Sequence, residues 1–410
     1  MVKHVSMAAA SLCLVFMIYI TLTLPSSLQA VEPASAAVRF VNEQGTPLAD
    51  ATLRLLCYAM ANATTPTHDL LVRTQNDGTL SLPLPSDCPY LAALHQLYIQ
   101  PGGKAGRQSA YTVYETSWAP GTRALLAANG DIVLHSDWRL LLFDVQISLE
   151  WQTSENSTMI QQLRSGMSAA SAYLYDLSDG QIAFGGLIIK SGGEGWEGAD
   201  IRIRAANDTR PSARVGGIVG QRTPYTSSTG LQTFYAPGEI LTGRAWDGES
   251  AASGDWSQPA AYRTLVHEWL HYGLFLYDEY QELAAEGRKE SYCTCNELPS
   301  LGITPGVCGG LSSELAASAM AYHYSASELW LSGLPASCRA TDQQLVHGES
   351  DWATLTRWSA LQGLPQEWLH QPQTLASGPS LGLAADLFGR QPTSLAEDQL
   401  FLPLISRSGS

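Results

Sequence analysis

The segment T-L-V-H-E-W-L-H-Y-G, residues 264–273, brings two histidines and a glutamate together. His267 and His271 are four residues apart, so on a helix their imidazoles project from one face, one turn apart. Two neutral imidazole nitrogens at this spacing form half of a tetrahedral zinc site, and Glu268 lies between them. We therefore expect one catalytic Zn²⁺ ion, with Glu268 as the general base that activates the zinc-bound water.

A catalytic zinc site takes three protein ligands and keeps a fourth position open. Asp278 stands seven residues beyond His271, where a returning chain could supply the third ligand. We expect Gly273 to end the helix and turn the chain back, because glycine readily adopts the left-handed conformation of helix ends. Glu279 is the nearest competitor for the third position, and Tyr277 would be a poor ligand because its phenol is neutral.

The pattern H-E-W-L-H followed by D-E-Y resembles the zinc motif of the metzincin-type peptidase domain in the calcium-activated chloride channel regulator family. By this resemblance His267, His271 and Asp278 would bind zinc, and Glu268 would be the catalytic base. Gly273 departs from the family pattern, because it follows the second histidine earlier than the family's glycine does.

The segment S-A-M-A-Y, residues 318–322, resembles the methionine turn of astacins and serralysins. By this resemblance Met320 would lie beneath the zinc ion, and Tyr322 would donate a hydrogen bond to the oxyanion, which is a common form of catalytic stabilisation. We expect the neighbouring His323 to be exposed and not to be a fourth ligand.

The composition is that of an exported globular protein. The formal net charge of −15 argues against nucleic acid and anionic membrane surfaces as partners, because phosphate groups would repel the chain. Residues 1–30 read as a cleaved signal peptide with a basic start and an apolar run from Met7 to Leu24. That run is just long enough to leave an uncleaved anchor as an alternative, and no other segment could span a membrane.

Outside the signal peptide the chain has six cysteines, an even number that suits disulfides in an oxidising compartment. Cys57 and Cys88 stand apart from the others and are expected to pair. The remaining four are expected to form two bridges of undetermined connectivity: Cys293, Cys295, Cys308 and Cys338.

The predicted fold class is α+β. Residues 37–138 read as short β segments that are similar to small immunoglobulin-like β-sandwich domains, and residues 139–370 read as the metzincin-like domain. Within the latter we expect a strand at 140–147, a helix at 159–175, strands at 182–189 and 199–203, and an edge or near-edge strand at 238–244. Residues 371–410, rich in Pro, Ser, Gly and Gln, are predicted to form an extended C-terminal tail.

The resulting hypothesis is a secreted or surface zinc endopeptidase that acts on a protein or peptide substrate. Two alternatives stay open. The zinc helix could be catalytically vestigial in an adhesion or interaction protein, although the intact Glu268 argues against this. The chain could instead be a gluzincin-type peptidase whose third ligand is Glu290 or Glu297, although the methionine segment argues against that. A structural Ca²⁺ ion could also be bound, but no motif identifies its ligands.

Overall fold

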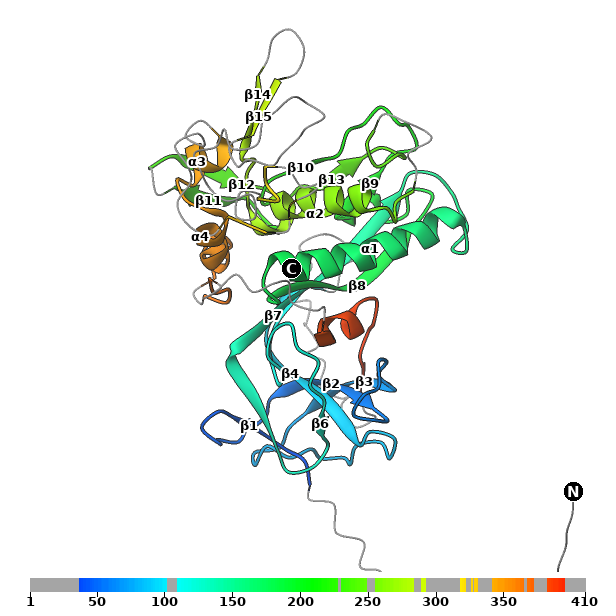
Figure 1. The fold of residues 1–410 in the computed structure, drawn as a ribbon, viewed down its shortest axis with the longest axis vertical. Helices are drawn as coiled ribbons and strands as arrows, with labels where there is room; N and C mark the ends of the chain where they lie inside the picture. The colour runs from blue at the N-terminus through cyan, green and yellow to red at the C-terminus, as the bar shows by residue number, and fades with distance from the viewer. Residues whose placement is uncertain are drawn as a thin grey trace, which may run out of the picture. The chain divides into compact units, whose positions relative to one another are not determined.

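A long strand, β7 (Asp131–Leu149), runs through the middle of the molecule and pairs with strands from both its N-terminal and its later part (Figure 1). The computed structural model describes residues 37–101, 109–227, 230–248, 255–283, 289–292, 318–321, 326, 328–330, 341–364, 367–371 and 382–394. Residues 37–410 group as one compact unit.

The described helices are few and the strands many. The helices are α1 (Thr158–Leu177), η1 (Trp196–Gly198), α2 (Pro259–Leu274), α3 (Asp342–Val346), α4 (Asp351–Thr356), α5 (Trp358–Leu361) and η5 (Gly382–Leu387). The strands before α1, besides β7, are β1 (Arg39–Asn42), β2 (Thr52–Tyr58), β3 (His68–Arg73), β4 (Tyr90–Pro101), β5 (Ser109–Thr116) and β6 (Leu126–Ala127). The later strands are β8 (Ile182–Lys190), β9 (Ile201–Ile203), β10 (Ser212–Ala213), β11 (Thr223–Thr226), β12 (Gln232–Tyr235), β13 (Ile240–Thr242), β14 (Tyr280–Leu283), β15 (Lys289–Tyr292) and β16 (Thr393–Ser394).

Twelve of the described strands form one mixed sheet. Its main path is β10-β13-β9-β7-β5-β4-β2-β3-β16, with β1 and β8 paired to β7 and β6 paired to β4. The hairpins β11–β12 and β14–β15 stand apart from it. The expected α+β class is thus confirmed. The boundary expected between residues 138 and 139 falls inside β7, so it does not separate two sheets.

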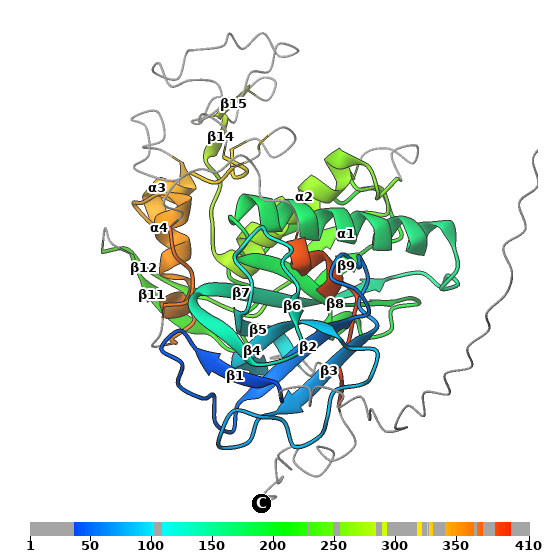
Figure 2. The same ribbon diagram turned by 60° about the horizontal axis from the view of Figure 1, so that its bottom comes forward.

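Helices α1 and α2 pack against each other over the later part of the sheet (Figures 1 and 2). The Ser157 side chain caps α1 by accepting a hydrogen bond from Ile160 N, and Leu163, Met167 and Leu174 lie in the core, as the periodicity predicts. The expected strands at 182–189 and 199–203 appear as β8 and β9. β13 lies one place in from the sheet edge, which β10 forms, and this agrees with an edge or near-edge position for residues 238–244.

Strand β2 is buried on both faces. Leu53, Leu55 and Cys57 belong to one core cluster and Leu56 and Tyr58 to another, because successive side chains of a strand point to opposite faces. The N-terminal part of the sheet is therefore covered on both sides.

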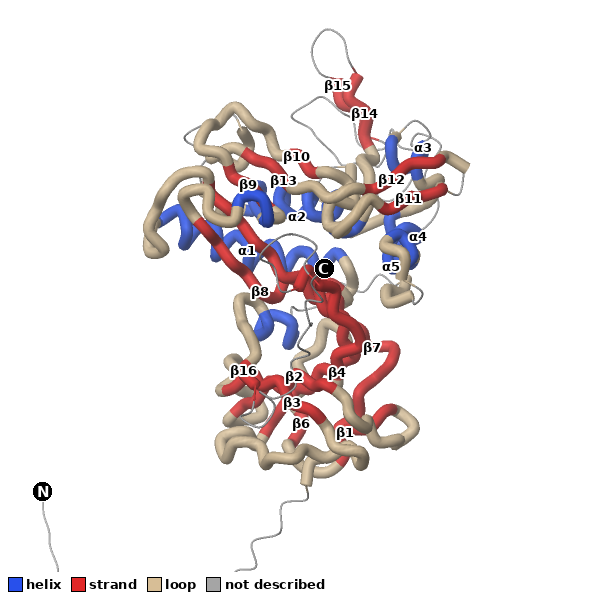
Figure 3. Tube along the Cα trace, turned by 180° about the vertical axis from the view of Figure 1, so that it is seen from behind, coloured by secondary structure: helices blue, strands red, loops and turns tan. Residues whose placement is uncertain are grey.

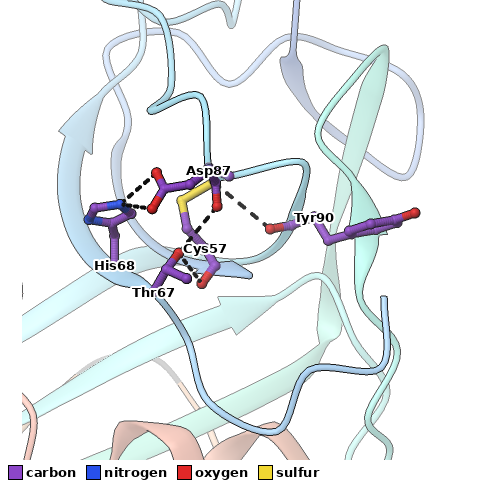
Figure 4. The surroundings of a disulfide bond; sticks show 6 residues. Cys57, Thr67, His68, Asp87 and Tyr90 are labelled. Atoms are coloured by element: carbon purple, nitrogen blue, oxygen red, sulfur yellow. Dashed lines mark hydrogen bonds and ion pairs between the residues drawn. A yellow bond between two sulfur atoms is a disulfide. The ribbon is translucent and has the colours of Figure 1, made fainter. Parts of the chain in front are cut away.

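The Cys57–Cys88 disulfide lies in the first of these clusters and confirms the expected pairing (Figure 4). Around it, the Thr67 hydroxyl donates to Cys57 O at 3.3 Å, and His68 Nε2 lies 2.8 Å from Asp87 Oδ1. The signal peptide and the four later cysteines lie outside the described residues. Within the described part of the chain, no helix is long and apolar enough to cross a membrane.

Residues 382–394 correct the prediction of an extended C-terminal tail. Leu383, Ala384 and Leu387 of η5 are buried in the second cluster. Asp386 accepts a hydrogen bond of 2.6 Å from the Tyr58 hydroxyl. Strand β16 then adds in parallel to β3, at the end of the sheet (Figure 3). A short apolar run inside a Pro- and Gly-rich stretch thus packs against the N-terminal part of the sheet.

We expect Leu387→Ala to lower the free energy of unfolding by about 2–5 kcal/mol, because it leaves a cavity in a packed cluster. The exposed Ser394→Ala is the matched control in the same segment. Urea titration of both variants measures the effect. Wild-type stability in Leu387→Ala would mean that the segment does not dock in solution.

Candidate metal centre

Helix α2 carries both histidines and is buried on all sides. Every residue from Thr264 to Leu274 is buried, as is typical of a helix that is largely apolar around its whole circumference. Pro259 lies in the first turn, where its missing N–H costs nothing. The Tyr272 hydroxyl donates to Asp200 Oδ1 at 2.5 Å and so fixes the helix to the sheet. The two histidines are therefore held on a rigid element.

The end of α2 corrects the role predicted for Gly273. The helix continues through Gly273 to Leu274, and the left-handed residue is Phe275, with φ 66° and ψ 14°. A Cβ atom on Gly273 would lie 2.8 Å from Nε1 of the buried Trp269. Glycine is needed here for space and not for its backbone conformation, because the left-handed turn is made two residues later by Phe275.

The structure brings His267, His271 and Asp278 together. Nε2 of each histidine lies 3.3 Å from Asp278 Oδ1. One ligand atom from each of the three residues lies within 4.8 Å of the others. The Asp278 side chain keeps 29 % exposure, so the cluster opens to solvent on that side.

Backbone carbonyls fix the tautomer of both histidines. His267 Nδ1 lies 2.9 Å from Ala319 O, and His271 Nδ1 lies 2.7 Å from Leu276 O. A carbonyl oxygen only accepts, so each Nδ1 carries the proton. Each neutral ring then presents the lone pair of Nε2 to the centre of the cluster. This is the arrangement by which outer partners orient metal-binding histidines.

The donor set fits a divalent cation. Asp278 Oδ1 is buried and makes no hydrogen bond of good geometry to any described residue. It lies 3.3 Å from Nε2 of each histidine, so a cation at the centre of the cluster would meet all three atoms. Two imidazoles and one carboxylate suit zinc.

The pKa shifts of His271 and Asp278 likewise show that the cluster favours one positive charge, which a proton or a metal ion can supply. Burial by itself would lower the pKa of His271, but the Asp278 carboxylate outweighs it and raises that pKa to about 9. Burial would raise the pKa of Asp278, but the two histidines, His271 foremost, hold it well below its usual range. A proton and a metal ion therefore compete for His271, so metal affinity falls as the pH falls below about 9.

Glu268 lies on the same helix between the two ligands and is also buried. Burial raises its pKa above the ordinary value, while His267 and His271 act in the opposite direction. A carboxylate with raised proton affinity is suited to take a proton and give it back.

The segment Ser318–Ala321 lies against both ligand-bearing segments. It forms a turn in which Ala321 N donates to Ser318 O. Met320 is fully buried in the same core cluster as Leu163 and Met167 of α1. Ala319 O faces His267, and Met320 O accepts from Glu279 N at 3.0 Å. The described part of the predicted methionine turn is therefore adjacent to the candidate centre.

Glu279, the expected competitor for the third position, is directed elsewhere. It is fully buried beside Ser318 and Asp351, and burial together with Asp351 raises its pKa well above the usual value. Asp351 Oδ2 accepts from Ser318 Oγ at 2.6 Å and from Trp330 N at 3.0 Å. Sequence reasoning missed this group, because Asp351 is a single carboxylate far along the chain from the zinc motif.

The remaining residues considered in the sequence analysis either lie apart from the candidate ligands or have side chains that the structure does not describe. Tyr277 packs its ring against His347, with centroids 5.4 Å apart, and does not join the candidate ligands. Tyr322, His323 and Glu297 lie outside the described residues. Glu290 belongs to β15, paired with Glu282 of β14, and its side chain is not described.

Comparisons with protein-family models, with curated proteins and with solved structures each found no match to this chain.

Gly273→Ala is expected to destabilise the protein by about 1–3 kcal/mol, because the new methyl group overpacks against Trp269. At an exposed helical position the same substitution would instead stabilise the protein, since alanine favours helix by about 1 kcal/mol over glycine. Thermal and urea unfolding give the sign, and stabilisation would contradict the close packing described above.

Purified protein is expected to bind one zinc ion, and His267→Ala, His271→Ala or Asp278→Ala should each lower zinc affinity by orders of magnitude. Glu290→Ala and Glu297→Ala, which leave the three donors intact, should bind zinc as the wild type does. Elemental analysis and competition with a chromogenic chelator measure occupancy and affinity. Full occupancy in both histidine variants would rule out this centre, and loss of zinc only in a glutamate variant would reassign the third ligand.

Proposed function

We propose that this protein is a zinc-dependent endopeptidase that acts outside the cytoplasm on protein or peptide substrates. The observation that carries the proposal is the convergence of His267, His271 and Asp278, with both histidine tautomers set by backbone carbonyls and with Glu268 between them. Three protein donors with one side open to solvent are typical of catalytic rather than structural zinc.

In this proposal His267, His271 and Asp278 hold the ion. The zinc, when bound, supplies a Lewis acid that polarises the scissile carbonyl and makes water easier to deprotonate. Glu268 takes the proton from the attacking water and later delivers it to the leaving amine. Its burial supports both tasks, because a carboxylate with raised pKa is easily protonated and still able to release the proton.

The sheet offers a place for an extended substrate. β10 is the end strand of the sheet and pairs on its inner side with β13. The chain leaving β10 contacts the C-terminal end of α2, where Gly216 N donates to His271 O at 2.9 Å. A peptide added to the outer edge of β10, the end strand among the described residues, would thus run close to the zinc helix, and strand addition is a common way to hold a peptide.

The order of strand, helix, strands and active-site helix supports a metzincin-like catalytic domain, and Tyr322 remains the proposed oxyanion donor by resemblance. The Cys57–Cys88 disulfide supports an oxidising compartment, in keeping with the predicted signal peptide. The strands of residues 37–138 belong to the common sheet. A separate β-sandwich domain formed by these residues stays a prediction.

Glu268→Ala is expected to keep its zinc and to lose at least about a hundredfold in kcat/KM, because general-base catalysis contributes about 10²–10⁴-fold. Glu268→Gln, which keeps the size of the side chain but cannot take the proton, should lose as much. Cleavage of casein or of a quenched fluorescent peptide library provides the rate, with zinc content measured on the same samples.

Two results would contradict the proposal. Wild-type rates in both Glu268 variants would remove Glu268 from the chemistry. Zinc-loaded wild-type protein that cleaves no protein or peptide would favour the interaction-protein alternative.

A further inference from the structure

Asp278 differs from the two histidines in what holds it. His267 and His271 lie on a buried helix, whereas Asp278 lies in the irregular segment 275–279 between α2 and β14. A metal ligand has to be held to within about 0.5 Å of its productive position, and a loop does not provide this by itself. Some other part of the chain must hold this segment.

The short helix α3 supplies that support. Gln343 N donates to Asp278 O at 3.2 Å, and Tyr277 N donates to Gln343 Oε1 at 2.9 Å. One residue thus binds both ends of the Tyr277–Asp278 dipeptide. At the other end of α3, His347 Nε2 donates to Phe275 O at 2.8 Å, beside the left-handed turn that ends α2.

The side chain of Gln343 has no freedom to turn. It is fully buried, and its Nε2 donates to Glu349 O at 3.1 Å and to Thr354 Oγ1 at 2.9 Å. Flipping the amide would set its NH₂ group against the N–H of Tyr277 and its oxygen against a carbonyl oxygen. Every polar atom of the amide is therefore used in one orientation only.

These bonds connect the ligand segment to the scaffold behind it. Thr354 belongs to α4, whose first residue, Asp351, binds Ser318 at the start of the turn that faces His267. The supports of the first and third ligands therefore meet at α4. A shift of α3 would move Asp278 relative to the two histidines.

We infer that Gln343 is a positioning residue for Asp278, its side chain acting through the hydrogen bond from Tyr277 N to Gln343 Oε1, beside the backbone bond from Gln343 N to Asp278 O. This inference rests on the proposed function, since it assigns the support of the same zinc site. The competing role for Gln343 is purely structural: its amide would satisfy buried polar groups with no effect on the metal.

The test is Gln343→Met, which keeps the length of the side chain, removes its three hydrogen bonds and leaves the backbone bond from residue 343 to Asp278 O in place. Zinc affinity is expected to fall about 10–100-fold, which is the usual cost of losing an outer partner of a metal ligand. Co²⁺ bound in place of zinc should show shifted visible absorption bands, because these bands depend on ligand geometry. With peptide substrates kcat should fall more than KM changes. Gln344→Met, on the same helix but without such contacts, is the matched control and should behave as the wild type.

A purely structural role would lower the melting temperature and leave zinc affinity and the Co²⁺ bands at wild-type values, and that result overturns the inference.

If Gln343→Met does not fold, Thr354→Val gives the decision by the same readouts, because it keeps the shape of the side chain and removes one of the two bonds that fix the Gln343 amide. Wild-type protein that binds no zinc overturns the proposed function and this inference together. Wild-type zinc binding with an unaffected Gln343→Met overturns the inference alone.

Discussion

Two imidazole nitrogens and a carboxylate oxygen meet within a buried part of this protein, and the surrounding structure has to hold these three ligand atoms within reach of one cation. A chain without tight support would relax by turning one of these groups towards water. Here each imidazole is fixed by a backbone carbonyl on its far side. The ligand atoms are thus held in place by hydrogen bonds to the outer side of each ring, which is how metal-binding histidines are commonly oriented.

The supporting groups come from parts of the sequence far from the zinc motif. The carbonyl that orients His267 belongs to Ala319, and the residues that hold the ligand segment belong to α3. Both supports converge on α4 through Asp351 and Thr354. The centre is therefore a product of tertiary packing, although its first two ligands lie on one helix.

This division explains what the sequence could predict. The pair His267 and His271 follows from helix geometry alone, and the α1 core face follows from periodicity, so both were accessible from local patterns. The conformation of Phe275 was not, because a left-handed bulky residue persists only where packing and the bond from His347 hold it. The docking of residues 382–394 was also hidden, since composition described the stretch as extended while Leu383 and Leu387 found a partner cluster that no local pattern reveals.

The return of the C-terminal segment to the first strands has a consequence for biogenesis. Tyr58 and Asp386 are hydrogen-bonded across 328 positions of sequence, and β16 covers the edge of β3. Until residues 382–394 have been made, the edge of β3 that β16 covers lacks this neighbour and is open to wrong pairings. Because these contacts join parts of the chain that are far apart in sequence, the N-terminal part of the sheet is completed late in folding.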